Sequence, residues 1–411
     1  MNRIAETDLP VHIQGLEIGT ISRSRALQDA LLFDYSDKAQ AQHAVSLTMP
    51  VVPDQYDSMM ALHPVFEMNL PEGALRERLT LMFAKLRPGF DDLELLRVVG
   101  ASQIGRLRYG DVAALALDVP AQNLQVLLSF KGAEDLFADL VVRYAHFSGL
   151  SGVQPKVLLR AEAGDGLPSW FARMTDKGAT HIVKAFDATA YPELAANEYF
   201  CMRAAGHAGL NVAKVALSSN RKVLVVDRFD LTEQGQYLAF EDFCVLSAMR
   251  AAGRYNASYE DLAIRIGQFV SPSHLLAAYE QLLGSVILAC VIGNGDAHLK
   301  NFGVLYEHYG AQVCMAPVYD MLSTRVYEPR DVMALSLAGS KAWPSKATLF
   351  AYGRLACQLS STQVRQVHER VLAGVELAGR ELERYAQAHP NFAGAAQRLQ
   401  AVFAKGLQTF A

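Results

Sequence analysis

The sequence IGNGDAHLKNFGVLY, residues 292–306, is the most informative stretch of this 411-residue chain. It follows a long apolar segment and opens with a turn at 293–295, whose two glycines tolerate the φ angles at which a helix ends. Asp296 comes directly after the turn, and Asn301 follows with the spacing Asp-x-x-x-x-Asn. The apolar run 302–306 predicts a buried strand. A carboxylate and an amide are therefore expected in one loop between a buried helix and a buried strand.

The same spacing occurs in the catalytic loop of protein kinases, where a metal-binding aspartate comes after the following strand. Asp320 holds that third place here. In phosphoryl transfer one carboxylate positions or deprotonates the attacking hydroxyl, and an amide with a second carboxylate holds magnesium. Asp296, Asn301 and Asp320 fit these roles in that order, and magnesium prefers such hard oxygen ligands. Taken alone, the turn propensity of the segment favours a plain hairpin turn, with Asp320 capping a strand end.

Two upstream residues favour the kinase interpretation. Lys184 lies in THIVKAF, residues 180–186, among apolar neighbours, as the strand lysine of kinases does. On the helix predicted at 192–206, Glu198 shares an apolar face. Because burial of an unpaired carboxylate is costly, we predict a Lys184–Glu198 ion pair of the kinase type. The alternative is that Glu198 reaches solvent at the rim of that face.

Two further segments suit a nucleotide. In FSGLSGVQPK, residues 147–156, two glycines let the backbone approach phosphates, serines offer hydroxyls, and Lys156 adds charge. This is neither a Walker loop nor a kinase Gly-x-Gly-x-x-Gly, and a plain turn before a strand explains it equally well. Asp227, Arg228 and Phe229 fall where a small lobe would pass into a large one. Their backbone is placed to meet an adenine ring with Phe229 nearby, and an ordinary strand end is the alternative.

Composition sets the general class. Hydrophobic residues make up 51% and charged residues 19% of the chain, as in ordinary globular proteins. A net charge of −4 gives no global attraction to nucleic acid or acidic membranes. The start lacks a signal-peptide pattern, and the apolar segment 282–293 is shorter than the roughly 20 residues that span a bilayer. Five widely spaced cysteines are expected to be reduced core thiols of a cytoplasmic protein.

The predicted elements change character along the chain. Strands are predicted at 151–160, 180–186 and 222–229, whereas 124–130 is either a strand or the lead into a helix. Helical periodicity predicts further helices at 73–86, 91–99, 241–252, 258–268, 272–292, 347–358, 361–387 and 391–408. The order predicts an α+β fold with a strand-rich small lobe before a helical large lobe.

Taken together, these segments resemble the HipA family of bacterial serine/threonine kinase toxins. The matching segments of the kinase core are 151–156, 181–184, 227–230, 241–243, 296–302 and 319–323. Weaker matches at 46–50, 69–77 and 95–100 extend the resemblance over nearly the whole chain. It implies a two-lobed, protein-kinase-like α+β fold of the HipA type. Its parts would be an N-terminal α/β subdomain (1–125), a small lobe with the ATP loop (126–229) and a helical large lobe (230–411).

The resemblance also implies residue roles. Asp296 would be the catalytic aspartate, Asn301 and Asp320 the magnesium ligands, and Lys184 a contact to the ATP phosphates. For His298 we expect bracing of the loop by hydrogen bonding rather than proton transfer. The residues implied to line the nucleotide site are Ser151, Gly152, Val153, Gln154, Lys156, Lys184, Asp227, Arg228, Phe229, His298, Lys300, Asn301, Tyr319 and Asp320.

One departure concerns autophosphorylation. The serine that the family phosphorylates lies three residues before the glycine of the ATP loop, and Gly149 stands there in this chain. Ser148 and Ser151 flank that position, and a related branch of the family carries a serine at the place of Ser151. Since Ser151 lies in the loop nearest the phosphates, we predict it as the phosphoacceptor.

The leading hypothesis is an ATP- and magnesium-dependent protein serine/threonine kinase that acts as a cytoplasmic toxin. The resemblance implies a translation protein, such as an aminoacyl-tRNA synthetase, as substrate, and a small helix-turn-helix antitoxin as partner. The alternatives are a small-molecule or lipid kinase, a metal-dependent nuclease acting on DNA, and a non-catalytic partner of the antitoxin in transcriptional repression. No basic arm stands out, so DNA contact is expected only through the antitoxin, and no membrane contact is expected.

Overall fold

The computed structural model describes residues 8–24, 30–58, 61–85, 89–111, 119, 121–129, 140, 156–161, 178–186 and 191–411. The predicted ATP loop at 151–155, with Ser151, Gly152, Val153 and Gln154, lies outside the described residues. The chain divides into two compact units built from interleaved segments. Unit 1 is Met1–Ala185, Val225–Ala251 and Leu305–Gln312, and unit 2 is Phe186–Leu224, Ala252–Val304 and Val313–Ala411. The division into 1–125, 126–229 and 230–411 stays a prediction.

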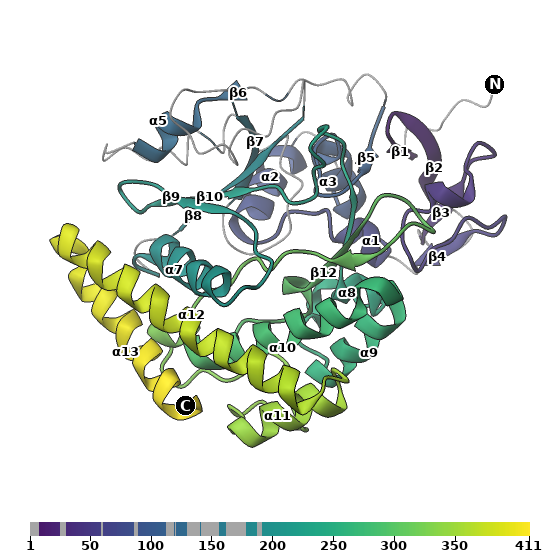
Figure 1. Ribbon diagram of the computed structural model, residues 1–411. Helices are drawn as coiled ribbons and strands as arrows, with labels where there is room; N and C mark the ends of the chain where they lie inside the picture. The colour runs from purple at the N-terminus through teal and green to yellow at the C-terminus, as the bar shows by residue number, and fades with distance from the viewer. Residues whose placement is uncertain are drawn as a thin grey trace. The chain divides into compact units, whose positions relative to one another are not determined.

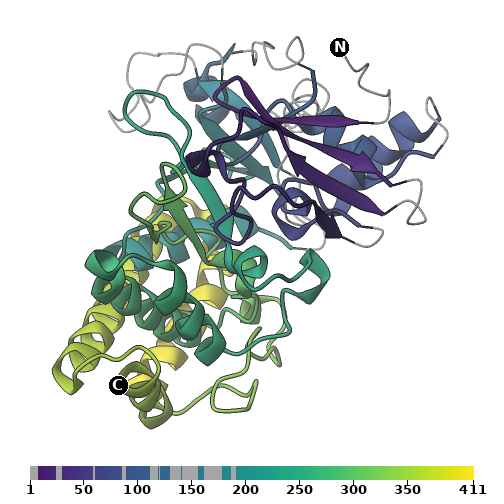
Figure 2. The same ribbon diagram turned by 90° about the vertical axis from the view of Figure 1, so that its right-hand side faces the viewer.

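Unit 1 begins with an antiparallel sheet in the order β4-β3-β2-β1-β5, drawn in purple and blue in Figure 2. Its strands are β1 (Leu9–Ile13), β2 (Leu16–Arg23), β3 (Leu31–Tyr35), β4 (Tyr56–Ser58) and β5 (Leu107–Tyr109). Gln14 and Gly15 join β1 to β2 with φ angles of 51° and 81°, as a tight hairpin turn requires. The helices α1 (Pro64–Glu67), α2 (Gly73–Ala84) and α3 (Asp92–Val99) come between β4 and β5. Both α2 and α3 agree with the sequence prediction.

A second sheet carries the residues predicted to meet the nucleotide. Its order is β6-β7-β8-β10-β9, and the boundary between the two units falls inside β10. The strands are β6 (Ala121–Gln122), β7 (Lys156–Ala161), β8 (His181–Ala185), β9 (Val215–Leu217) and β10 (Val223–Asp227). The ambiguous segment after β6 is helical, as α5 (Leu124–Ser129). In the antiparallel pair β7–β8, Lys156 stands directly opposite Lys184.

The helix predicted at 241–252 is wrong in length. The chain forms β11 (Ala239–Asp242) and then only a short helix, α8 (Phe243–Leu246), which Asp242 caps by accepting from the backbone N–H of Val245. Ala248 has a φ of 54°, which no helix continues through. The backbone N–H of Ala251 then donates to Glu67 at 2.8 Å, so contacts within unit 1 end the helix. The end of β12 (Gly303–Tyr306) lies beside β11.

Unit 2 is mainly helical, as predicted. Its long helices are α7 (Leu194–His207), α9 (Tyr259–Phe269), α10 (Leu275–Ile292), α11 (Lys346–Leu355), α12 (Ser361–Ala388) and α13 (Ala393–Phe410). Helices α12 and α13 run side by side, and α10 packs against both (Figure 1). The start of β12 pairs with the short strand β13 (Cys314–Met315). None of the five cysteines, all of which the structure describes, forms a disulfide bond, and all but Cys314 are buried.

Helix α10 forms the core of unit 2. Every residue from Leu282 to Ile292 is buried. The segment Pro272–Ile292 is long and apolar enough to cross a membrane. The apolar segment is therefore longer than residues 282–293, whose length alone was compared with the thickness of a bilayer. However, 72% of its most apolar window is buried inside the protein. Burial on all sides explains why this helix is apolar around its whole circumference.

Candidate active site

The end of α10 positions the loop that carries Asp296. Gly293 has a φ of 64° and ends the helix, with its N–H bonded to the carbonyl oxygen of Ala289. A Cβ at Gly293 would lie 2.8 Å from Cδ of Arg325, so a glycine is needed for space as well as for conformation. The backbone N–H of Gly295 donates to Oγ1 of Thr324 at 2.7 Å. These contacts hold the turn in one conformation just before Asp296.

Asp296 is a half-open carboxylate with a hydroxyl partner. Its Oδ1 accepts a 2.7 Å hydrogen bond from the hydroxyl of Tyr255, and 48% of its side chain is exposed. Burial of its inner side raises the pKa of Asp296 to about 6, the charge of Asp320 adds to this, and the Tyr255 bond and the charge of Arg254 oppose it. A carboxylate with such a pKa is ionised at pH 7 and still basic enough to accept a proton.

Sequence reasoning missed Tyr255. It lies 41 residues before Asp296 and in no motif, so no local pattern indicated the contact. Its ring also packs edge-on against the ring of His298, with the centroids 5.0 Å apart. Tyr255 therefore contacts two side chains of this loop, those of Asp296 and His298.

His298 is neutral in these surroundings. Burial and the charge of Arg254 lower the pKa of His298 to about 4. Its backbone N–H donates to Oδ1 of Asn301 at 3.0 Å, and its ring Nε2 lies 4.0 Å from Oδ1 of Asp296. The backbone of His298 thus orients Asn301, and at neutral pH the ring carries no proton that it readily loses.

Asn301 and Asp320 meet across the strand β12. Nδ2 of Asn301 donates to Oδ2 of Asp320 at 3.0 Å, and both side chains line a hollow of about 10 Å³. Asp320 has a φ of 59°, a left-handed conformation that is uncommon for residues other than glycine and costs free energy. Two bonds hold the segment that follows: Nδ2 of Asn197 donates to the carbonyl oxygen of Ser323 at 2.9 Å, and the N–H of Ser323 donates to Oδ1 of Asn197 at 2.8 Å.

These two side chains fit magnesium. Among the described residues no group of three or more histidine, cysteine, aspartate or glutamate side chains is placed to hold a metal. Magnesium does not need such a cage, because it keeps several waters and takes one or two carboxylates together with substrate phosphates. Asp320 supplies a carboxylate and Asn301 an amide oxygen. The hydroxyl of Tyr319, the residue before Asp320, donates to the carbonyl oxygen of Lys300, the residue before Asn301, at 2.7 Å.

In unit 1, two lysines share one face of the second sheet. Lys156 and Lys184 are directly opposite in the β7–β8 pair, so their side chains point to the same side. Both are buried, with 9% and 6% exposure. Two lysine side chains on one face of the sheet are of the charge that suits a phosphate-bearing ligand.

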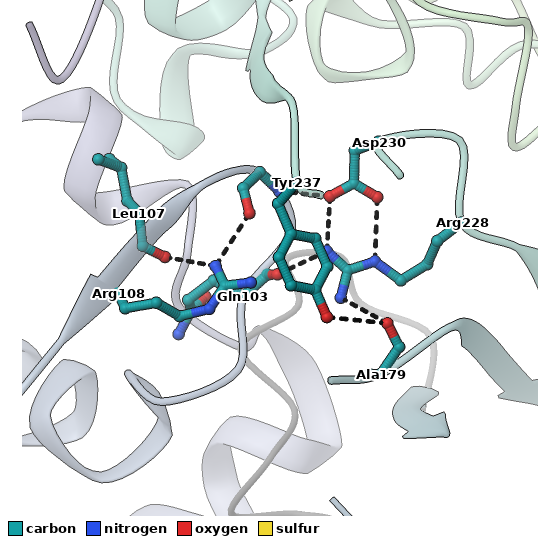
Figure 3. Close-up of polar contacts among 8 residues, drawn as sticks. Gln103, Leu107, Arg108, Ala179, Arg228, Asp230 and Tyr237 are labelled. Atoms are coloured by element: carbon teal, nitrogen blue, oxygen red, sulfur yellow. Dashed lines mark hydrogen bonds and ion pairs between the residues drawn. The ribbon is translucent and has the colours of Figure 1, made fainter. Parts of the chain in front are cut away.

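Asp227 and Arg228 point into the interior of unit 1. Oδ1 of Asp227 lies 3.8 Å from Nε2 of His181, and both side chains are buried. Figure 3 shows Arg228, which is 0% exposed. Its guanidinium donates twice to Asp230, from Nε at 3.0 Å and from Nη2 at 2.5 Å. Nη2 also donates to the carbonyl oxygen of Gln103 at 2.7 Å.

Tyr237 completes this cluster, which we call the Arg228 cluster (Gln103, Arg108, Ala179, Arg228, Asp230 and Tyr237). The ring of Tyr237 lies 4.3 Å from Cζ of Arg108 and 4.5 Å from Cζ of Arg228 (Figure 3). Its hydroxyl donates to the carbonyl oxygen of Ala179 at 3.1 Å. Since the guanidinium of Arg228 is used internally, any contact of 227–229 with a nucleotide would involve the backbone and Phe229.

The predicted Lys184–Glu198 pair stays a prediction. Glu198 lies on α7 in unit 2 and is 1% exposed, so the sequence pattern placed it correctly on a buried face. Lys184 lies in unit 1.

The comparisons with known proteins agree with the fold. The fold is α+β and protein-kinase-like, with a half-open aspartate in a loop after a buried helix. A family model described as the HipA-like C-terminal domain matches residues 148–378, and one described as the HipA N-terminal domain matches residues 9–110. The first of these covers more than half of the chain. The chain belongs to the HipA family.

Individual relatives support this assignment. The "Putative kinase Y4mE" of Sinorhizobium fredii is 34% identical over 192 residues, which is 43% of each chain. The serine/threonine-protein kinase toxin HipA of Shewanella oneidensis is 31% identical over 200 residues, or 44% of each. The matched region thus spans less than half the length of these relatives. A HipA toxin–antitoxin complex from Shewanella oneidensis contains a chain with the same fold (TM-score 0.67, 18% identity, 98% of both chains).

Proposed function

We propose that this chain is an ATP- and magnesium-dependent protein serine/threonine kinase and the toxin of a HipA-type toxin–antitoxin pair. One observation carries the proposal: Asn301 and Asp320 are joined by a 3.0 Å hydrogen bond, and Asp320 is held at a φ of 59°. This brings together an asparagine that follows Asp296 by five residues and a second aspartate, the two side chains that hold magnesium in kinase-type phosphoryl transfer.

Each residue has a defined task in this proposal. Asp296 accepts the proton of a serine or threonine hydroxyl, and Tyr255 orients its carboxylate through Oδ1. Asn301 and Asp320 hold the magnesium ion, which when bound offsets the negative charge of the phosphates. Lys156 and Lys184 attract the phosphates from their shared face of the second sheet. Glu198 would orient Lys184, and Ser151 would be the autophosphorylated residue.

The partners are proposed from the relatives. The solved structural neighbour is described as a complex of HipA with HipB and operator DNA. For this chain we infer a small helix-turn-helix antitoxin as partner, with DNA contacted through that antitoxin, in the bacterial cytoplasm. The substrate would be a protein of the translation machinery, such as an aminoacyl-tRNA synthetase, whose phosphorylation stops growth.

The nuclease alternative has less support. Hydrolysis of a phosphodiester commonly uses two metal ions about 4 Å apart, held by several carboxylates and histidines. The part of the chain that the structure describes holds no cluster of three such side chains. One carboxylate and one amide suit a metal that is completed by the phosphates of a nucleotide.

Transfer of labelled γ-phosphate from Mg-ATP in a bacterial lysate tests the proposal. We expect one or a few labelled lysate proteins with the wild type and none with Asp320→Ala. Calorimetry with Mg-ATP should give binding to the wild type and much weaker binding to the variant. A folded wild type that binds Mg-ATP and labels nothing would contradict the kinase proposal and favour the role in repression. Phosphopeptide mapping of wild type and Ser151→Ala tests the phosphoacceptor.

A further inference from the structure

Unit 2 contains a second cavity that includes none of the predicted site residues. Its volume is about 310 Å³, and its walls are the last turn of α10, residues between 325 and 344, and helix α13. Gly406 brings α13 directly onto α10, because a Cβ there would lie 1.8 Å from the carbonyl oxygen of Val291. Small-molecule sites span roughly 300–1,000 Å³, so the cavity has room for a compact metabolite.

The charge of this cavity is one-sided. Arg325 and Lys405 line it, and no carboxylate side chain is among its lining residues. Neither cation forms an ion pair with any residue that the structure describes. Arg325 instead donates from Nη2 to the carbonyl oxygen of Pro329 at 3.3 Å, and its Cζ lies 5.6 Å from the centre of the Trp343 ring. Two cations without acidic partners form a site for an anion.

The remaining walls are mostly apolar, with Thr409 as a polar exception. Nε1 of Trp343 donates to the carbonyl oxygen of Asp331 at 2.7 Å, which satisfies the polar edge of the ring and holds its position. Val402 and the buried Phe410 add apolar surface from α13. A ligand that fills the cavity therefore needs an anionic group for the two cations and an apolar, preferably aromatic, body for these walls.

Arg325 connects this cavity to the loop of Asp296. The backbone N–H of Arg325 donates to the carbonyl oxygen of Gly293 at 3.1 Å, and the Arg325 side chain lies against Gly293 itself. Oγ1 of the adjacent Thr324 lies 3.2 Å from that same carbonyl oxygen, donates to the carboxylate of Asp331, and accepts from the N–H of Gly295 at 2.7 Å. A ligand that fixes Arg325 therefore acts on the turn that comes directly before Asp296.

We propose that the cavity between α10 and α13 binds a small organic anion with an apolar body, and that this ligand stabilises the turn at 293–295. The effect on phosphoryl transfer rests on the proposed kinase function, whereas binding and stabilisation of the turn do not. The two parts can therefore be tested without any activity measurement.

Tryptophan fluorescence of the full chain tests binding. The chain has two tryptophans, so Trp170→Phe leaves Trp343 as the only reporter. Phenyl phosphate is the probe, with inorganic phosphate and phenol as its separate halves. We expect a saturable change with phenyl phosphate at millimolar concentration or below, and at least about tenfold weaker binding of either half, because each half lacks one set of contacts.

Charge variants of α13 locate the site. In the Trp170→Phe background, Lys405→Glu should weaken binding of phenyl phosphate by at least about tenfold, and Lys405→Gln by a smaller factor. Arg398→Glu makes the same charge change on the same helix outside the cavity and should alter binding by less than about twofold. Equal binding by wild type and Lys405→Glu, no saturable change at all, or competition by Mg-ADP would overturn the site.

Hydrogen exchange tests the connection to the turn. Saturating phenyl phosphate should slow the exchange of the backbone amides at 293–296 by at least about threefold, and it should have no such effect in Lys405→Glu. Binding with unchanged exchange at these amides would overturn the connection. Because neither readout uses ATP, a failed kinase proposal would leave both results interpretable.

Discussion

The Arg228 cluster of unit 1 buries and pairs its charged side chains, whereas the Asp296 loop of unit 2 leaves a carboxylate partly exposed. Arg228 and Asp230 are 0% and 1% exposed and bonded to each other, and Asp230 also accepts from the N–H of Gly105 at 2.6 Å. Asp296 keeps 48% of its side chain exposed and has a raised pKa. Asp320 is held in a left-handed conformation.

The difference separates charges that stabilise the fold from charges that are suited to a reaction. A buried ion pair contributes only when its hydrogen bonds are complete, as they are around Arg228. A reacting carboxylate must be reachable and must have a pKa near the working pH. The two regions should therefore respond to substitution in different measurements.

Replacing the half-open carboxylate should remove activity and spare stability. We expect Asp296→Asn to lower γ-phosphate transfer by about 10²–10⁴-fold, because an amide cannot accept the proton of the attacking hydroxyl. The urea midpoint of unfolding should stay the same or rise slightly. The raised pKa means that folding disfavours the ionised carboxylate of Asp296, and the substitution removes this cost. Transfer within tenfold of the wild type would remove Asp296 from the catalytic role.

Replacing the buried carboxylate should do the reverse. Asp230→Ala leaves Arg228 as an uncompensated buried charge, and we expect unit 1 to lose about 3–5 kcal/mol of stability. Urea unfolding followed by circular dichroism measures this. Glu280→Ala is the matched control, because its single 3.2 Å contact with Arg370 is partly exposed and should contribute less than about 1 kcal/mol. Equal losses in the two variants would contradict the contrast.

The aromatic member of the Arg228 cluster should have a smaller effect. Tyr237→Leu removes a ring that lies between two guanidinium groups and a hydroxyl bonded to Ala179, and we expect a loss of about 1–2 kcal/mol. Tyr237→Phe keeps the ring and should recover about half of the loss. If both variants unfold at the wild-type urea concentration, the stacking makes no net contribution.

The smallest expected effect is a shift in a pH profile. With a pKa of about 6, Asp296 becomes protonated as the pH falls through 6, so the transfer rate should fall along that acid limb. The hydroxyl of Tyr255 stabilises the ionised carboxylate, so Tyr255→Phe should move the limb upward by about half to one pH unit. A downward shift would show that Tyr255 does not act on the carboxylate in this way.

Periodicity and spacing were sufficient for much of the fold. The apolar pattern of 272–292 predicted α10, and the turn after it placed Asp296 in a loop next to β12. The pattern of 194–202 placed Glu198 on a buried face of α7. These are local properties of helices and strands, which a sequence carries directly. Asn301 and Asp320, 19 residues apart, were grouped by motif order, and their side chains do meet.

Other features depend on contacts between distant segments. Tyr255 meets Asp296 across 41 residues, and no motif includes it. The sequence put Arg228 beside a nucleotide, but its orientation depends on Asp230 and on Gln103, which is 125 residues away. The helix predicted at 241–252 stops early because Ala251 is bonded to Glu67, 184 residues away. Helical propensity is a weak prior, and tertiary contacts of this kind override it.

The interleaved construction of unit 1 has a consequence for synthesis on the ribosome. Its last segment, Leu305–Gln312, emerges after Met1–Ala185 by roughly 6–24 s at about 5–20 residues per second. Until then Glu241 lacks the hydroxyl of Tyr306, and Arg106 lacks the carbonyl oxygen of Glu307. Unit 1 therefore cannot complete the hydrogen bonds of Glu241 and Arg106 until residues 305–312 have been synthesised. During that interval it is a natural client for chaperones.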